Sequence, residues 1–366
     1  LKNSHLHFSC RQQSHPFHNI KLLAMKKLMQ LSLVILAVLS IALTGCKKDD
    51  IVTPETSYET LSKYVAQNNL DLPTIVSGFT KSGSQININM TDFSVPDYFV
   101  IDVRAAADYN TGHIKNAVNV PIANLLEAVA SVPKDQNILV TCYTGQTASR
   151  AVVALRMMGY TKVYSLKWGM ASWHADFASR WDSKVANVTS PGWVNTGAPT
   201  VSTTGALPTF TSTATTGDKI LEERVKATLA NTSWTVNRDD VLANPGNYFI
   251  NNYWPAVSWD AFGHFAGAYR IFEDLKVENL GLLRTDKPLV TYCYTGQTSG
   301  IVTTWLQIMG YDNARSLSFG ANAIVYDQLK VSAVDDAKKK SWKGEGSGSA
   351  NNFGYYDSTN TMHNPL

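Results

Sequence analysis

One six-residue segment occurs twice in the chain, each time between an apolar run and a helical pattern. Cys-Tyr-Thr-Gly-Gln-Thr stands at 142–147 and again at 293–298. Short apolar runs precede both copies, at 137–141 and 288–292, and both helical patterns end in Met-Gly-Tyr. A short apolar run before a helical pattern predicts a buried strand that turns into a helix. Each cysteine is therefore expected at the turn between a strand and a helix.

The two segments belong to a longer repeat. From Cys142 to Cys293 the offset is 151 residues, and Gly-His pairs at 112–113 and 263–264 share it. Strand patterns alternate with helix patterns within each copy, which predicts an α/β fold with mainly parallel sheets flanked by helices. With 366 residues, the chain is long enough for two such domains.

Changes in composition give the expected domain boundaries. Residues 186–217 are rich in Ser, Thr and Gly, which predicts a linker, and the Gly/Ser/Asn-rich end predicts an extended or disordered tail. In that tail Phe353, Tyr355 and Tyr356 offer a means of docking on a domain. The expected segments are upstream sequence plus a removed lipoprotein signal peptide (1–45), a tether (46–56), a first α/β domain (57–185), the linker (186–217), a second α/β domain (218–340) and a flexible tail (341–366).

The beginning of the chain reads as an export signal. Lys26 and Lys27 precede an apolar core at 28–42 that is short for a membrane span. The following Leu-Thr-Gly-Cys46 resembles a bacterial lipobox. This resemblance implies that Cys46 carries acyl chains such as palmitate and anchors the protein to a membrane of the cell envelope. We expect the outer membrane or surface of a Gram-negative bacterium; an uncleaved transmembrane helix is the alternative.

Charge and composition exclude several kinds of partner. The formal net charge is +3, but residues 1–45 contain basic and no acidic residues, so the remainder is close to neutral. Without a basic stripe, we expect no nucleic-acid partner. The sequence has neither a Cys/His cluster with metal-ligand spacing nor a Gly-rich nucleotide loop, so we expect no metal and no cofactor.

The predicted position of the cysteines suits anion chemistry at sulfur. Backbone N–H groups at a helix N-terminus favour a thiolate and bind anions. A plain buried cysteine is the alternative. The expected anion-binding residues are Tyr143, Thr144, Gly145, Gln146 and Thr147 in the first loop and Tyr294, Thr295, Gly296, Gln297 and Thr298 in the second.

Four motifs in order make the chain resemble the rhodanese family of sulfurtransferases. They are Asp-Val-Arg at 102–104, Gly-His-Ile-Lys-Asn-Ala at 112–117, the loop at 142–147, and Trp-Gly-Met-Ala-Ser-Trp at 168–173. The resemblance covers both halves and implies two rhodanese-like domains. It implies that a catalytic cysteine takes sulfane sulfur from a small sulfur-containing anion or persulfide. The resulting cysteine persulfide passes that sulfur to a thiol or another thiophilic acceptor.

Two other functions compete with sulfur transfer. Phosphatases of a related fold use a longer loop, Cys-x5-Arg, but these loops end at Thr147 and Thr298, and Arg150 lies too far along the helix. The other alternative is a non-catalytic lipoprotein that uses the fold to bind a ligand.

The two copies are not equal in sequence. Asp102, Arg104, His113 and Arg150 are expected to support the first site. The second half keeps the Gly-His motif but has no Asp or Arg in the region that matches 102–104. Of the two expected catalytic residues, Cys142 and Cys293, the sequence therefore favours Cys142 as the main nucleophile.

Overall fold

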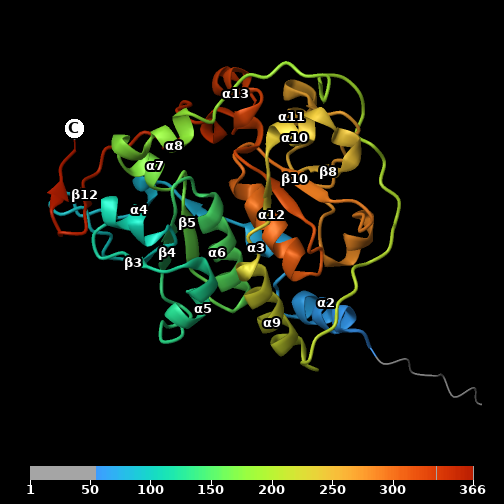
Figure 1. The fold of residues 1–366 in the computed structure, drawn as a ribbon, viewed down its shortest axis with the longest axis horizontal. Coiled ribbons are helices and arrows are strands. Elements are labelled where there is room, and N and C mark those ends of the chain that lie inside the picture. Colours follow the sequence, from blue (N-terminus) through green and yellow to red (C-terminus); the bar gives the residue numbers. More distant parts are fainter. Residues whose placement is uncertain (1–54, 335, 366) are drawn as a thin grey trace, which may run out of the picture. The chain divides into compact units, whose positions relative to one another are not determined.

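Two parallel sheets organise the part of the chain that the computed structural model describes, residues 55–334 and 336–365 (Figure 1). The strand order is β1-β5-β4-β2-β3 in the first sheet and β7-β11-β10-β8 in the second, and all strand pairs within both sheets are parallel. Parallel neighbours need crossover connections, which helices mostly supply here. The predicted α/β fold class, with mainly parallel sheets flanked by helices, is confirmed.

The elements follow the predicted alternation. Those of the first half are α2 (Ser57–Gln67), α3 (Leu72–Val76), β1 (Thr80–Lys81), β2 (Phe99–Asp102), α4 (Ala106–Thr111), β3 (Val118–Asn119), α5 (Leu125–Ala128), β4 (Ile138–Thr141), α6 (Gln146–Met157), β5 (Val163–Leu166), α7 (Met170–Trp173) and α8 (Ser179–Asp182). Those that follow are β6 (Trp193–Val194), α9 (Gly217–Ala230), β7 (Thr235–Val236), α10 (Arg238–Ala243), β8 (Phe249–Asn252), α11 (Ala256–Phe262), β9 (His264–Phe265), β10 (Leu289–Tyr292), α12 (Gln297–Ile308), β11 (Arg315–Leu317), α13 (Tyr326–Val331), β12 (Tyr355–Tyr356) and β13 (Met362–His363).

Helices α6 and α12 join the two halves. They have equal length, lie at the repeat offset and pack against each other more extensively than any other pair of described helices (Figure 1). Leu155 of α6 and Leu306 of α12 belong to one hydrophobic core that draws on both halves. Burial of apolar surface on both faces explains why nearly every residue of the two helices is buried. The boundaries expected for two separate domains stay a prediction.

The linker and the tail are more ordered than their composition suggests. In the linker, β6 pairs antiparallel with β9. In the tail, β12 and β13 form a hairpin, the rings of Phe353 and Trp173 lie 4.9 Å apart, and the Trp173 indole N–H donates to the Gly354 carbonyl at 2.8 Å. The expectation of a flexible tail therefore differs from the structure, because aromatic side chains anchor this segment on the first half.

Some expectations fall beyond the described residues. Cys46, the signal peptide and most of the tether lie outside them. Within the described ranges, no helix is long and apolar enough to cross a membrane.

Candidate functional site

The two cysteine loops have the same backbone design. Gly145 and Gly296 cap α6 and α12 with φ values of 79° and 78°, a left-handed conformation that glycine adopts without strain. Cys142 and Cys293 directly follow β4 and β10. Both thiols consequently lie at the carboxyl end of a parallel sheet, beside a helix N-terminus, where α/β proteins commonly bind ligands. Both are free cysteines.

The thiol of Cys142 is buried among backbone donors. Its Sγ accepts N–H groups from Gly145 at 3.2 Å and Ala148 at 3.4 Å. Burial raises the pKa of the Cys142 thiol, and the loop N–H groups, which act in the opposite direction, do not offset that effect. The prediction that the helix N-terminus favours the thiolate is therefore wrong for Cys142, because desolvation of the buried thiol outweighs the backbone donors.

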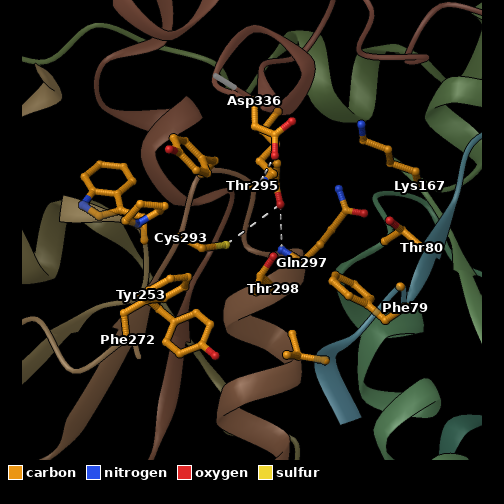
Figure 2. A pocket seen from close by; sticks show the side chains of 16 residues that line it. Phe79, Thr80, Lys167, Tyr253, Phe272, Cys293, Thr295, Gln297, Thr298 and Asp336 are labelled. Carbon is orange, nitrogen blue, oxygen red and sulfur yellow. Dashed lines mark hydrogen bonds and ion pairs between the residues drawn. The ribbon is translucent and has the colours of Figure 1, made fainter. Parts of the chain in front are cut away.

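The thiol of Cys293 has a different neighbour. Its Sγ accepts the Ser299 N–H at 3.3 Å, donates to Ser299 Oγ at 3.5 Å, and lies 4.0 Å from Thr295 Oγ1 (Figure 2). Ser299 stands at the repeat offset from Ala148, so the second loop has an additional hydroxyl at sulfur. Ser299 is not among the site residues predicted from the sequence, although comparison of the two copies at this offset reveals it.

A cavity of about 490 Å³ opens over Cys293 (Figure 2). Both halves build it, and Cys142 is not among the residues that line it. The lining includes Phe79, Thr80 and Lys167 from the first half, Tyr253, Phe272, Thr295, Gln297 and Thr298 from the second half, and Asp336 and Lys340 after α13. The loop of the second cysteine thus faces a space large enough for a ligand.

Lysines gather at one end of this cavity. Lys167 donates to the Lys339 carbonyl at 2.8 Å, and Lys340 forms an ion pair with Asp336 at 3.4 Å. Burial, with a further contribution from the nearby Lys340 charge, lowers the pKa of Lys167 to about 8. The cluster has more cationic than anionic groups and therefore attracts anions.

Two glutamines link the loops reciprocally. Gln146 accepts the Phe319 N–H through Oε1 at 2.9 Å, while Gln297 accepts the Trp168 N–H at 3.3 Å. Trp168 and Phe319 have positive φ values of 69° and 63°, which are uncommon for bulky side chains. Each glutamine thus satisfies a constrained backbone group of the other half. Both were expected only as anion-binding residues.

The glycine after each constrained residue permits close approach to the cysteine loop. A Cβ on Gly169 would lie 2.3 Å from the Cys142 carbonyl oxygen, and one on Gly320 would lie 2.3 Å from that of Cys293. No side chain fits at either place. The Trp-Gly motif recognised in the sequence therefore closes the back of the first loop.

Asp102 and Arg104 form a buried ion pair beside the first loop. Arg104 Nη2 donates to Asp102 at 2.6 Å and to the Gly112 carbonyl at 2.6 Å, and its guanidinium carbon lies 4.8 Å from the Tyr143 ring centre. In the second sheet Asn252 pairs with Tyr292 as Asp102 pairs with Thr141. The second half has an amide where the first has a carboxylate.

His113 and Arg150 make structural contacts. The His113 ring stacks on Tyr109 at 3.9 Å, its Nδ1 lies 3.1 Å from the Tyr109 carbonyl, and burial lowers its pKa. Arg150 donates to the carbonyl groups of Thr228 at 2.6 Å and Asn231 at 3.0 Å. These bonds connect α6 to the end of α9, where a cation is favourable.

The described residues contain no cluster of side chains suited to bind a metal ion. Between residues 55 and 365, leaving out residue 335, no group of three or more His, Cys, Asp or Glu side chains is placed to hold a metal ion.

Comparisons with known proteins find relatives of part of this chain, and the match of the family model includes Cys142. The family model of the rhodanese-like domain matches residues 88–176. The thiosulfate sulfurtransferase GlpE of Shewanella oneidensis is 33% identical over 75 residues, which are 20% of this chain and 74% of that protein. GlpE of Coxiella burnetii is 34% identical over 79 residues, 22% of this chain and 74% of that protein.

A solved structure agrees in sequence over the same share of the chain. The crystal structure of a rhodanese-like domain from an Anabaena sp. protein is 36% identical and covers 21% of this chain and 88% of that domain, with a TM-score of 0.20. The two GlpE proteins are 33% and 34% identical to this chain over nearly three quarters of their own length. The chain belongs to the rhodanese-like family of sulfurtransferases.

Proposed function

We propose that this protein is a sulfurtransferase that moves sulfane sulfur from a donor such as thiosulfate to a thiophilic acceptor through a cysteine persulfide. The observation that carries the proposal is the thiol of Cys293, which lies at the wall of a cavity of about 490 Å³. It accepts the Ser299 N–H and donates to the Ser299 hydroxyl. The relatives named as thiosulfate sulfurtransferases support the same reaction class.

The reaction has two steps. After the Cys293 thiol releases its proton to solvent, the thiolate attacks the sulfane sulfur of thiosulfate. A sulfur–sulfur bond forms to cysteine, the bond to the sulfonate sulfur breaks, and sulfite leaves with the electron pair. An acceptor thiolate then attacks the outer sulfur of the persulfide and frees the cysteine thiolate. The Ser299 N–H and the Thr295 hydroxyl are positioned to stabilise negative charge near sulfur.

Different observations favour each of the two cysteines as the nucleophile. Cys142 belongs to the segment that matches the family model and keeps the Asp102–Arg104 pair. Cys293 lines the cavity and has the additional hydroxyl of Ser299. We propose Cys293 as the nucleophile for small donors, because its thiol lines the cavity, and Cys142 as a second nucleophile.

Mass spectrometry of the protein after thiosulfate treatment tests the function. We expect a gain of one sulfur atom on Cys293 that is present in Cys142→Ser and absent in Cys293→Ser. The double variant controls for sulfur bound elsewhere. Absence of an adduct on both cysteines of the wild type contradicts sulfur transfer and favours a binding role.

We further propose that the protein is exported and lipid-anchored through Cys46. The basis is the signal-like pattern before Leu-Thr-Gly-Cys46. Expression in a Gram-negative host with labelled palmitate tests this proposal. We expect label in the membrane fraction and its loss in Cys46→Ala. Equal labelling of both proteins contradicts the anchor.

A further inference from the structure

The cavity over Cys293 has two chemically different ends. In Figure 2, Lys167 and Asp336 lie on one side of Thr295, while Tyr253 and Phe272 lie on the opposite side of Cys293. Phe79 lines the wall across from Tyr253 and Phe272, next to Thr80. The reactive sulfur thus lies between a charged end and an aromatic end.

The size of the cavity exceeds the needs of a small inorganic anion. Pockets of roughly 300–1,000 Å³ enclose organic ligands in proteins, and this cavity has about 490 Å³. An inorganic thiosulfate ion has no apolar part to bury against Tyr253, Phe272 or Phe79. The aromatic end therefore has no function in binding that ion.

The structure points to a substrate class, given the proposed sulfur transfer at this site. We propose that the Cys293 cavity prefers organic anions that carry sulfane sulfur on an aromatic or branched apolar body, such as aryl thiosulfonates. The apolar body lies against Tyr253 and Phe272. The anionic oxygens face Thr295 and the cationic end, and the sulfane sulfur meets Cys293.

Lys167 is a residue of the first half of the chain that contributes to the Cys293 cavity. It follows β5 of the first sheet, yet lines the cavity of the second cysteine. The residue at the repeat offset from Lys167 is Ser318. Lys339 and Lys340 form ion pairs with Asp336, and Lys167 donates to the Lys339 carbonyl. Three ammonium groups thus stand against one carboxylate, so positive charge remains for an anion. Lys167 is therefore an anion-binding residue of the Cys293 cavity, whereas Ser318 at the matching position of the second half is uncharged.

The chemistry balances with such a donor. The Cys293 thiolate attacks the terminal sulfur of R–SO₂–S⁻, and a cysteine–sulfur bond forms. The bond between the two donor sulfurs breaks, and the sulfinate R–SO₂⁻ leaves with the electron pair. The cysteine persulfide anion remains, and total charge is unchanged.

The test compares two donors in the Cys142→Ser protein, so that Cys293 is the cysteine in question. The rate of persulfide formation per donor concentration is measured with 4-methylbenzenethiosulfonate and with thiosulfate, together with sulfinate or sulfite release. We expect a preference for the aryl donor of about tenfold or more, the scale that burial of a small apolar group gives.

Two variants of the cavity sharpen the test. Phe272→Leu and Phe272→Ala are expected to reduce the ratio of the aryl rate to the thiosulfate rate progressively, by about tenfold for Ala. Lys167→Met is expected to lower the rate of persulfide formation with both donors, and Lys167→Arg is expected to restore that rate. Lys162→Met, an exposed lysine outside the cavity, is the matched control.

The outcomes separate this inference from the proposed function. Equal rates for the two donors, or an aryl preference that Phe272→Ala leaves intact, would overturn the inference. Persulfide on Cys293 would in that case still support the proposed sulfur transfer. No persulfide on Cys293 with any donor overturns both.

Discussion

The loops of Cys142 and Cys293 share six residues, a glycine cap with nearly the same φ, and a helix of twelve residues. Their surroundings differ. The sulfur of Cys142 accepts the Ala148 N–H, and the buried Arg104 lies over the Tyr143 ring of the same loop. The sulfur of Cys293 contacts Ser299 and lines a cavity. The comparison teaches that a loop sequence fixes local geometry, while neighbouring segments decide whether the thiol can meet a ligand.

The segment before the edge strand shows the same contrast. Thr80 of β1 pairs with Ser165, and Thr235 of β7 pairs with Ser316, so Phe79 and Trp234 are counterparts. Phe79 lines the cavity over Cys293. Trp234 instead lies over the guanidinium of Arg150 at 4.8 Å. One aromatic residue borders an open space and the other covers a buried cation.

The largest expected effect is loss of turnover on removal of the Cys293 thiol, which lines the cavity. Cys293→Ser is expected to reduce sulfite release from thiosulfate by about a thousandfold or more, because a catalytic nucleophile is lost. Cys142→Ser is expected to retain most of the rate. Retention of more than about a tenth of the rate in Cys293→Ser, well above the loss expected for a nucleophile, would reverse the assignment of the two sites.

The next effect concerns stability and the buried ion pair. Asp102→Ala leaves Arg104 buried without its partner, so we expect a loss of about 3–5 kcal/mol in the free energy of unfolding. Asn252→Ala, the matched change in the second sheet, removes a hydrogen bond to the Tyr292 hydroxyl and is expected to cost about 1–3 kcal/mol. Denaturant unfolding measures both. Equal losses would remove this distinction between the halves.

A smaller loss is expected when the glutamine link between the loops is cut. Gln146→Ala leaves the Phe319 N–H without its acceptor in a constrained conformation, which we expect to cost about 1–3 kcal/mol. Gln297→Ala is expected to cost less, because its bond to Trp168 is longer at 3.3 Å. Gln67→Ala, at the exposed end of α2, is the control in the same unfolding experiment. No difference between Gln146→Ala and this control would show that the link contributes nothing.

The smallest effect is a pH dependence confined to the Cys293 side. Because the pKa of Lys167 is lowered to about 8, its charge is present below that pH and lost as pH rises through it. Anion binding should weaken accordingly, with KM for thiosulfate in Cys142→Ser rising about fivefold from pH 7 to pH 9, the scale of a partly exposed charge pair. Lys167→Arg should abolish the rise, since arginine stays charged. A rise that persists in Lys167→Arg assigns the dependence to another group.

Local sequence patterns predicted the framework of the site. The apolar run at 138–141 is β4 itself, and both cysteines stand at a strand-to-helix turn because glycine at 145 and 296 permits the left-handed cap. Short apolar runs and helical spacing report on backbone hydrogen bonds and on one buried face, which are nearby along the chain. The α/β class and the position of each thiol follow from such information.

Other properties depended on segments far apart in the chain. Gln146 finds its partner at Phe319, and the Cys293 cavity draws Phe79 and Lys167 from the first half. The docked tail depends likewise on Trp173 and Phe353.

The sequence by itself therefore determined the fold class, the duplicated strand–cysteine–helix unit and the kind of chemistry that the loops suit. Only the tertiary structure decided that the Cys293 thiol lines a cavity and that burial raises the pKa of the Cys142 thiol. The physical reason is that loop geometry arises from short-range sterics and hydrogen bonds, whereas solvent access and local charge arise from the packing of distant side chains.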